Sequence, residues 1–180
     1  TYAGVRPLCD DESDQPSAIT RDYTLALSGH PGEAPLLSVF GGKLTTYRKL
    51  AESALSQLAP YFSHMQSSWT ASAPLPGGEQ MSSVDELSER LCQQFGWLPL
   101  SLAKRWASSY GSRTWRLLEG VNTLSDLGEH LGAGLYSREV DYLCREEWAQ
   151  GSADILWRRS KLGLFMTPGQ QAKLEHYLNT

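Results

Sequence analysis

The chain has 180 residues, of which 41% are hydrophobic and 20% charged, so its composition is that of a globular protein rather than a disordered one. Sixteen Lys and Arg against twenty Asp and Glu give a net charge of −4, which argues against a nucleic-acid-binding protein. No apolar run approaches the ~20 residues of a membrane span, and three distant cysteines form neither a disulfide framework nor a CxxC metal site. Because the first residue is Thr1 rather than Met, we expect a processed chain or a fragment.

The first third of the chain predicts a little sheet and one helix. Residues 23–27 alternate in polarity and residues 36–40 are apolar, and the breaker-rich residues between them predict a hairpin with a long loop. A helix should begin at Thr45 or Thr46 and end near Pro60, because apolar residues recur there at helical spacing: Tyr47, Leu50, Ala51, Ala54, Leu55 and Leu58.

Residues 63–82 are rich in Ser, Pro and Gly and predict a linker, after which the chain is almost wholly helical. Ser83 and Glu86 form an S-x-x-E capping box at the first of these helices. Further helices are predicted around Trp106, between Val140 and Trp148, over residues 152–162 and from Pro168, and both tryptophans are expected in the core. Residues 112–136 give no clear pattern.

These elements predict a mainly α protein: a helical C-terminal domain preceded by a small β-hairpin plus helix. The predicted division is residues 1–62, a linker over 63–82, and a helical domain over 83–180. Two or three strands are too few for a stable α/β domain, so the first part is expected to be the tail end of an α+β domain whose beginning is missing.

The strongest local motif is Ser38-Val-Phe-Gly-Gly-Lys-Leu-Thr-Thr-Tyr-Arg48, which runs from a strand through two glycines into a helix. Gly41 and Gly42 allow a ligand to approach the backbone, the helix start presents unpaired N–H groups, and Lys43 adds a positive charge. The motif suits an anion or a group that gains negative charge. On the motif alone, a glycine-containing loop with a threonine cap is the favoured interpretation, and neither a Walker loop nor G-x-G-x-x-G is present.

Other residues carry weaker signals. Arg6, held extended by Pro7, suits a carboxylate or phosphate, or an ion pair with a nearby aspartate, and Arg21 is similar. The four histidines are scattered, so neither a catalytic histidine nor a metal site is predicted. Trp157 beside Arg158, Arg159 and Lys161 suits anionic lipid headgroups, although a solvated helix end with acidic partners is favoured.

Three segments together resemble one family. Tyr2-Ala-Gly-Val-Arg-Pro-Leu8, Ile19-Thr-Arg-Asp-Tyr23 and the Gly-Gly-Lys-Leu-Thr-Thr motif are similar to the C-terminal part of bacterial aerobic glycerol-3-phosphate dehydrogenase. Ser125–Glu129 and Leu156–Gly163 resemble the helical C-terminal domain of the same family, so the resemblance covers essentially the whole chain.

The resemblance implies an FAD-dependent enzyme that oxidises sn-glycerol 3-phosphate to dihydroxyacetone phosphate and passes electrons to quinone. It implies a cytoplasmic location, peripheral on the inner face of the cytoplasmic membrane, and leaves a homodimer open. The FAD fingerprint and the histidine that is the usual candidate for the catalytic base would lie in the absent N-terminal half, so no catalytic residue is expected here. The fragment alone should be inactive.

The same resemblance assigns binding roles to residues of this chain. Arg6, Arg21 and Lys43 would contact the substrate. Gly41, Gly42, Leu44, Thr45 and Thr46 would pack on the flavin. Two alternatives stay open: an oxygen-using glycerol-3-phosphate oxidase of the same fold, and a stand-alone helical protein-interaction module that binds no flavin.

Overall fold

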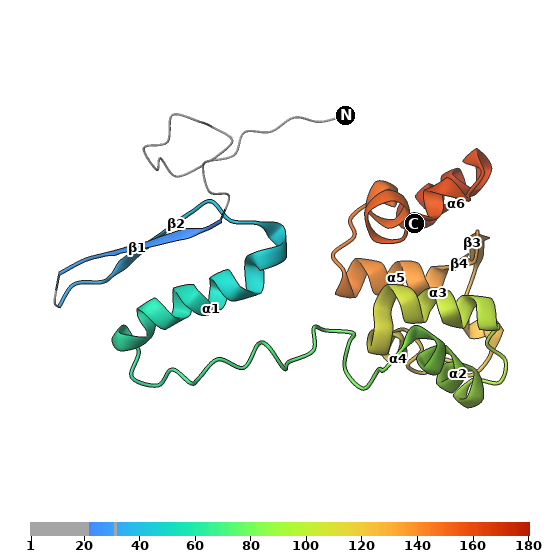
Figure 1. Cartoon of the computed structure of the whole chain (residues 1–180). Coiled ribbons are helices and arrows are strands. Elements are labelled where there is room, and N and C mark those ends of the chain that lie inside the picture. Colours follow the sequence, from blue (N-terminus) through green and yellow to red (C-terminus); the bar gives the residue numbers. More distant parts are fainter. Residues whose placement is uncertain (1–21, 31) are drawn as a thin grey trace. The chain divides into compact units, whose positions relative to one another are not determined.

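The computed structural model describes residues 22–30 and 32–180 (Figure 1). The chain divides between Ala73 and Pro74 into two compact units, which we call the hairpin unit and the helical unit. The division falls inside the segment 63–82. Arg6 and Arg21, with everything predicted for residues 1–21, lie outside the described residues.

The hairpin unit contains the predicted strands. Strands β1 (Thr24–Ser28) and β2 (Leu36–Phe40) pair antiparallel, with Thr24 opposite Phe40 and Ser28 opposite Leu36 (blue in Figure 1). A 3₁₀ turn (Leu44–Thr46) leads into α1 (Tyr47–Leu58), and a second 3₁₀ turn that contains Pro60 ends it. The hairpin and the helix are therefore confirmed, and proline ends the helix as expected.

Two close approaches between described residues hold the hairpin against α1. The Tyr23 hydroxyl lies 3.0 Å from Ser53 Oγ, and Gly42 lies so close to α1 that a Cβ there would be 3.2 Å from Leu50 Cδ1. None of the described residues from 22 to 73 is buried. Their large apolar side chains remain exposed, among them Leu36, Phe40, Leu44, Tyr47, Leu55 and Trp69.

The segment between the units has no helix or strand from residue 62 to 83, but it is tied down at both ends. At the first end, Ser68 and Thr70 donate hydrogen bonds to the Glu52 carboxylate, each at 2.5 Å. At the other end, the Ser112 amide donates to the Gly77 carbonyl at 2.8 Å. Residues 71–76 lie between these two anchors.

The helical unit begins with α2 (Val84–Gln94) and α3 (Leu100–Tyr110), followed by the short α4 (Thr114–Leu117). A two-strand hairpin of β3 (His130–Gly132) and β4 (Leu135–Tyr136) precedes α5 (Ser137–Glu146). A six-residue π-helix (Asp154–Arg159), a 3₁₀ turn (Leu162–Leu164) and α6 (Pro168–Leu178) complete it (Figure 1). The structure is mainly α, as predicted.

This unit has one apolar core to which every α-helix contributes. The predicted inner face of α3 is buried throughout, and Trp106 is fully enclosed. The other large, fully buried side chains are mostly leucines: Leu87, Leu91, Leu117, Leu118, Leu127, Leu131, Leu135, Leu143, Ile155, Leu174 and Tyr142. Burial of this kind contributes about 1.5–3 kcal/mol for each large side chain, so the unit has what a stable fold needs.

The helix starts agree with the sequence prediction with one change. Ser83 Oγ accepts the Glu86 amide at 3.1 Å, which is the predicted cap of α2. The Glu86 carboxylate accepts a hydrogen bond from the Ser82 hydroxyl instead of the Ser83 amide, so only half of the predicted box forms. Thr167 caps α6, and Pro168 occupies its first turn as predicted.

Two predictions for the later helices are wrong. Trp148 is not in the core: α5 ends at Glu146, and Trp148 is 81% exposed with a left-handed φ of 55°. Residues 152–162 do not form one α-helix, because the chain adopts the π-helix, reaches a left-handed φ at Lys161, and then makes a 3₁₀ turn.

Candidate functional site

The Gly-Gly-Lys motif forms the turn that joins β2 to α1. Gly41 and Gly42 have φ values of 71° and 108°, in the region that favours glycine. Lys43 returns to extended backbone and precedes the 3₁₀ turn. The two glycines are therefore needed for the path of the chain itself, and they also leave exposed backbone without side chains beside a helix start.

Lys43 and Thr46 fix this helix start together. The Thr46 amide and hydroxyl both donate to the Lys43 carbonyl, at 3.0 and 3.1 Å. The Thr46 hydroxyl is thus used inside the turn, whereas Thr45 is exposed. Within the described part of the chain, the Lys43 ammonium has no hydrogen-bond or ion-pair partner, so its charge is available to a ligand.

Large apolar side chains close to Lys43 in the sequence are exposed. Leu44 is 90% exposed, and Tyr47 and Phe40 are about half exposed at 56% and 46%. A positive charge, a helix start, bare glycine backbone and exposed apolar groups suit a ligand that combines an anion with a flat apolar ring. Of the three residues predicted to bind substrate, the structure describes only Lys43.

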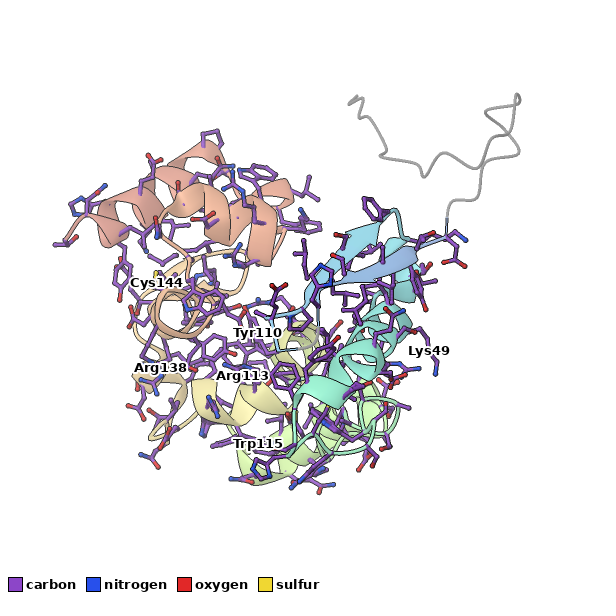
Figure 2. All side chains as sticks on the ribbon, turned by 90° about the vertical axis from the view of Figure 1, so that its left-hand side faces the viewer. Lys49, Tyr110, Arg113, Trp115, Arg138 and Cys144 are labelled. Atoms are coloured by element: carbon purple, nitrogen blue, oxygen red, sulfur yellow. The ribbon has the colours of Figure 1, made fainter. Side chains whose placement is uncertain are left out.

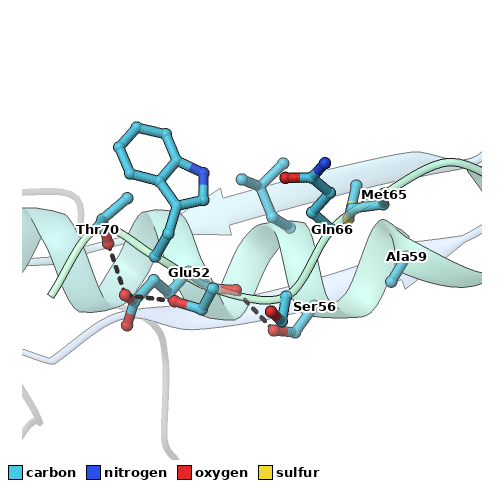
Figure 3. A pocket seen from close by; sticks show the side chains of 10 residues that line it. Glu52, Ser56, Ala59, Met65, Gln66 and Thr70 are labelled. Atoms are coloured by element: carbon cyan, nitrogen blue, oxygen red, sulfur yellow. Dashed lines mark hydrogen bonds between the residues drawn. The ribbon is translucent and has the colours of Figure 1, made fainter. Parts of the chain in front are cut away.

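A hollow of about 460 Å³ lies beside α1, between the helix and residues 65–70 (Figure 3). Its acidic side chain, Glu52, was not predicted from the sequence. The Ser68 and Thr70 hydroxyls, helped by Lys49 and Arg48, hold the pKa of the Glu52 carboxyl at about 2. Its carboxylate accepts hydrogen bonds from Arg48, Lys49, Ser68 and Thr70, so Glu52 ties the segment to α1.

The helical unit has its own charged cluster. Arg105 of α3 donates two hydrogen bonds of 2.6 Å to the Glu139 carboxylate of α5, and Tyr110 adds a third at 2.6 Å. Glu139 is fully buried, and burial together with this carboxylate raises the pKa of Tyr110. Figure 2 shows Tyr110 inside the helical unit. The buried carboxylate and its three hydrogen bonds join α3 to α5.

The remaining sequence candidates gain no chemical role from the geometry. No group of three His, Cys, Asp or Glu side chains among the described residues could hold a metal ion. Arg158 pairs with Asp154 at 2.8 Å, and Arg159 donates to the Glu147 carbonyl at 3.0 Å, which agrees with the favoured solvated helix end. No helix in the described part of the chain is long and apolar enough to cross a bilayer.

Comparison with known proteins gives consistent results. Residues 68–177 match the family described as the C-terminal domain of alpha-glycerophosphate oxidase. The whole chain is 69% identical to glycerol-3-phosphate dehydrogenase of Pseudomonas aeruginosa, and 99% of it is 50% identical to aerobic glycerol-3-phosphate dehydrogenase of Escherichia coli. Over 96% of the chain, D-erythritol 1-phosphate dehydrogenase of Brucella abortus is 42% identical.

The chain spans about a third of the length of these relatives, namely 35%, 36% and 34%. The aligned part is a C-terminal part of the two glycerol-3-phosphate dehydrogenases. The motif at residues 41–46 lies outside the matched family domain, which begins at residue 68, but inside the part shared with the three dehydrogenases.

Proposed function

The chain belongs to the family of the C-terminal domain of alpha-glycerophosphate oxidase, and on this premise we propose that it is the C-terminal third of a flavoenzyme that oxidises sn-glycerol 3-phosphate to dihydroxyacetone phosphate. The observation that carries the proposal is the 69% identity to a glycerol-3-phosphate dehydrogenase over all 180 residues. Identity is lower, at 42%, to the dehydrogenase named for erythritol 1-phosphate, which makes glycerol 3-phosphate the first substrate to test.

Substrate binding falls to the cationic residues. A phosphate dianion is best held by guanidinium and ammonium groups, and Lys43 offers an unpaired ammonium in an exposed turn. We assign Lys43, Arg6 and Arg21 to the phosphate and hydroxyls of the substrate. No catalytic residue is assigned within this chain.

The turn at residues 41–46 fits a flavin. Gly41 and Gly42 leave the backbone uncovered, and Leu44 extends an apolar side chain that nothing described covers. These three residues with Thr45 and Thr46 would lie against the ring system. FAD supplies the electron acceptor for substrate oxidation. The start of α1 would stabilise negative charge near the ring, because its first N–H groups and its dipole favour anions.

The remaining parts of the proposal concern the whole enzyme. We propose that residues 1–62 complete the FAD and substrate domain and that residues 83–180 form the helical domain. Residues 63–82 would be the linker between these two domains. The exposed apolar side chains of the hairpin unit support this, since a preceding domain would cover them. This chain alone would then be inactive. The electron acceptor would be quinone, at the inner face of the cytoplasmic membrane.

The experiment is to express this chain with its natural upstream coding sequence. The proposal predicts a yellow protein that glycerol 3-phosphate bleaches and that then reduces a quinone analogue. A colourless protein would contradict it. Bleaching by erythritol 1-phosphate alone would change the substrate, and re-oxidation by oxygen in preference to quinone would make the enzyme an oxidase.

Two lysines of the hairpin unit provide a matched test of the site. Lys43→Ala should raise KM for glycerol 3-phosphate about tenfold to a hundredfold, because a hydrogen bond to a charged group contributes about 1.5–3 kcal/mol. Lys49→Ala is the control, since Lys49 lies at the outside of α1 (Figure 2) and pairs with Glu52 at 3.2 Å. Equal KM values for both variants would remove Lys43 from the site.

A further inference from the structure

The exposed apolar side chains of the helical unit are concentrated in one stretch. Of the seven large hydrophobic side chains exposed from Pro74 onward, four lie between residues 148 and 165, and Trp148, Leu164 and Phe165 are 81%, 70% and 73% exposed. Three cations lie in the same stretch. We call this surface the 148–165 patch; it comprises Trp148, Trp157, Leu164, Phe165, Arg158, Arg159 and Lys161.

Two contacts bring parts of this stretch together. Arg159 Nε donates to the Glu147 carbonyl at 3.0 Å, which brings the π-helix beside Trp148. The Trp157 ring covers Gly163, where a Cβ would lie only 2.5 Å from the ring, so Trp157 also borders Leu164. The stretch thus combines exposed apolar side chains with cations, and exposed apolar groups that gather on a protein surface mark a contact site.

The backbone of the patch is strained. Trp148 has a φ of 55° and Lys161 a φ of 59°, conformations that side chains other than glycine rarely adopt. Glycine is the usual residue at the end of a helix such as α5, yet here a tryptophan occupies it and extends outward. The π-helix between them is itself a rare element that occurs at functional sites.

We propose that the 148–165 patch is the docking surface for the part of the full-length protein that precedes this chain. This inference rests on the proposed function, which places that part in the same polypeptide. About two thirds of the length of the relatives lies outside the segment they share with this chain, so a covering body of sufficient size exists in them.

The connection between the units favours a covalently attached occupant. Thr70 is bound to Glu52, and Gly77 to Ser112, so residues 71–76 form a short tether between these two anchors. Six residues extend to about 20 Å at most. A domain attached through this tether is therefore present at an effective concentration of about millimolar, far above that of a free partner.

The charge of the patch defines the surface that fits it. Arg158, Arg159 and Lys161 carry three positive charges, and the negative charge of Asp154 neutralises one of them. The patch therefore has a net charge of +2, although the whole chain has a net charge of −4. The occupant should present apolar side chains bordered by carboxylates. A membrane is less suitable, because the patch contains only short helical elements, the six-residue π-helix and the 3₁₀ turn, whereas surface-bound helices present a long apolar face.

The test uses the full-length protein with a single introduced cysteine. Leu164→Cys is compared with Leu100→Cys, which replaces the same residue type at a position 51% exposed and outside the patch. Maleimide modification of each cysteine is followed by peptide mass spectrometry. Docking predicts that Leu164→Cys reacts about tenfold or more slowly than Leu100→Cys, although Leu164 is the more exposed residue in this chain.

A second variant links protection to the patch. Trp148→Gly relieves the left-handed backbone and removes the exposed ring, so it should keep the helical unit folded while it accelerates the reaction of Leu164→Cys. Equal reaction rates for the two cysteine positions would overturn the proposal. Protection that is lost on dilution would identify a second copy, and protection that requires phosphatidylglycerol vesicles would identify a membrane; either result would overturn it too.

Turnover of glycerol 3-phosphate is measured on the same preparations, which separates the two proposals. Turnover without protection of Leu164→Cys contradicts the docking surface alone. Protection without turnover contradicts the proposed substrate and keeps the docking surface.

Discussion

The hairpin unit and the helical unit differ in what their apolar residues contact. In the helical unit, Leu87, Leu91 and Trp106 lie in a common core with side chains from every α-helix. In the hairpin unit, none of the described residues is buried, although strands and helix form at the predicted positions. Local sequence is enough to specify secondary structure, but among the described residues the tertiary burial that stabilises a fold is found in the helical unit.

The proposed function offers an explanation for this difference in burial between the two units. Every residue that we assign to substrate or flavin precedes residue 47, whereas the matched family domain begins at residue 68. The assigned binding residues thus lie in the unit whose described residues form no buried core. We expect this unit to need the preceding part of the enzyme before it can bind a ligand. The predictions below test this division.

The largest effect is expected for Glu139→Ala. It leaves the Arg105 guanidinium, with a side chain only 22% exposed, without its carboxylate, and breaking a buried pair costs about 3–5 kcal/mol. Urea unfolding of the chain, followed by the fluorescence of the buried Trp106, measures the loss. The control is Asp85→Ala, because Asp85 pairs with Lys104 at 3.0 Å on the surface and should contribute about 0–1 kcal/mol. Equal losses would mean that the cluster is not structural.

Leucine truncations compare the two units directly. Leu91→Ala removes a fully buried side chain and should lower the free energy of unfolding of this chain by about 2–5 kcal/mol. Leu44→Ala removes one that is 90% exposed and should change it by about 0.5 kcal/mol or less. In the full-length protein, Leu44→Ala should weaken flavin retention, which is measured as the FAD-to-protein absorbance ratio. A large loss for Leu44→Ala in this chain would contradict the division.

Sequence periodicity predicted most elements but failed where distant contacts decide the structure. The inner face of α3 was predicted because its apolar residues repeat at helical spacing, and all of them are buried. Trp148 continues the helical spacing of the apolar residues in α5. However, α5 ends at Glu146, and the left-handed backbone at Trp148 leaves its side chain exposed.

The polar contacts were harder to predict than the helices. Arg105 and Glu139 are 34 residues apart, so no local pattern could pair them, and residues 112–136 fold through short turns that depend on the core. The candidate site was predictable as a turn, since glycines and a helix start are local features. The substrate-binding roles of Arg6, Arg21 and Lys43 remain predictions.

The Glu52 tether has a defined pH dependence. Its pKa is lowered to about 2 by Ser68 and Thr70, from an ordinary value of 4.5, so the folded state favours the charged carboxylate. The resulting stabilisation is present above pH 4.5 and is lost as the pH falls through about 2. NMR titration of the Glu52 carboxyl should give a pKa of about 2. A value near 4.5 would mean that the tether does not form in solution.

The smallest effect is expected at Trp148. The left-handed conformation costs a residue with a side chain about 1–2 kcal/mol, and Trp148→Gly removes this cost. The greater flexibility of glycine in the unfolded chain offsets part of the gain in stability. We expect thermal unfolding of the helical unit to be unchanged or raised by a few degrees. Trp106→Gly is the contrasting variant, since the same substitution in the core should strongly destabilise the unit. A destabilised Trp148→Gly would show that the ring is packed after all.

Amide hydrogen exchange tests the central claim most directly, when this chain is compared with the full-length protein. We predict that α3 exchanges slowly in both, because its contacts lie within the helical unit. Strands β1 and β2 and helix α1 should exchange about a hundredfold or more faster in the chain alone than in the full-length protein, where the preceding domain covers them. Equal exchange of β1, β2 and α1 in both proteins would contradict the account, because the hairpin unit would then be complete without the rest of the enzyme.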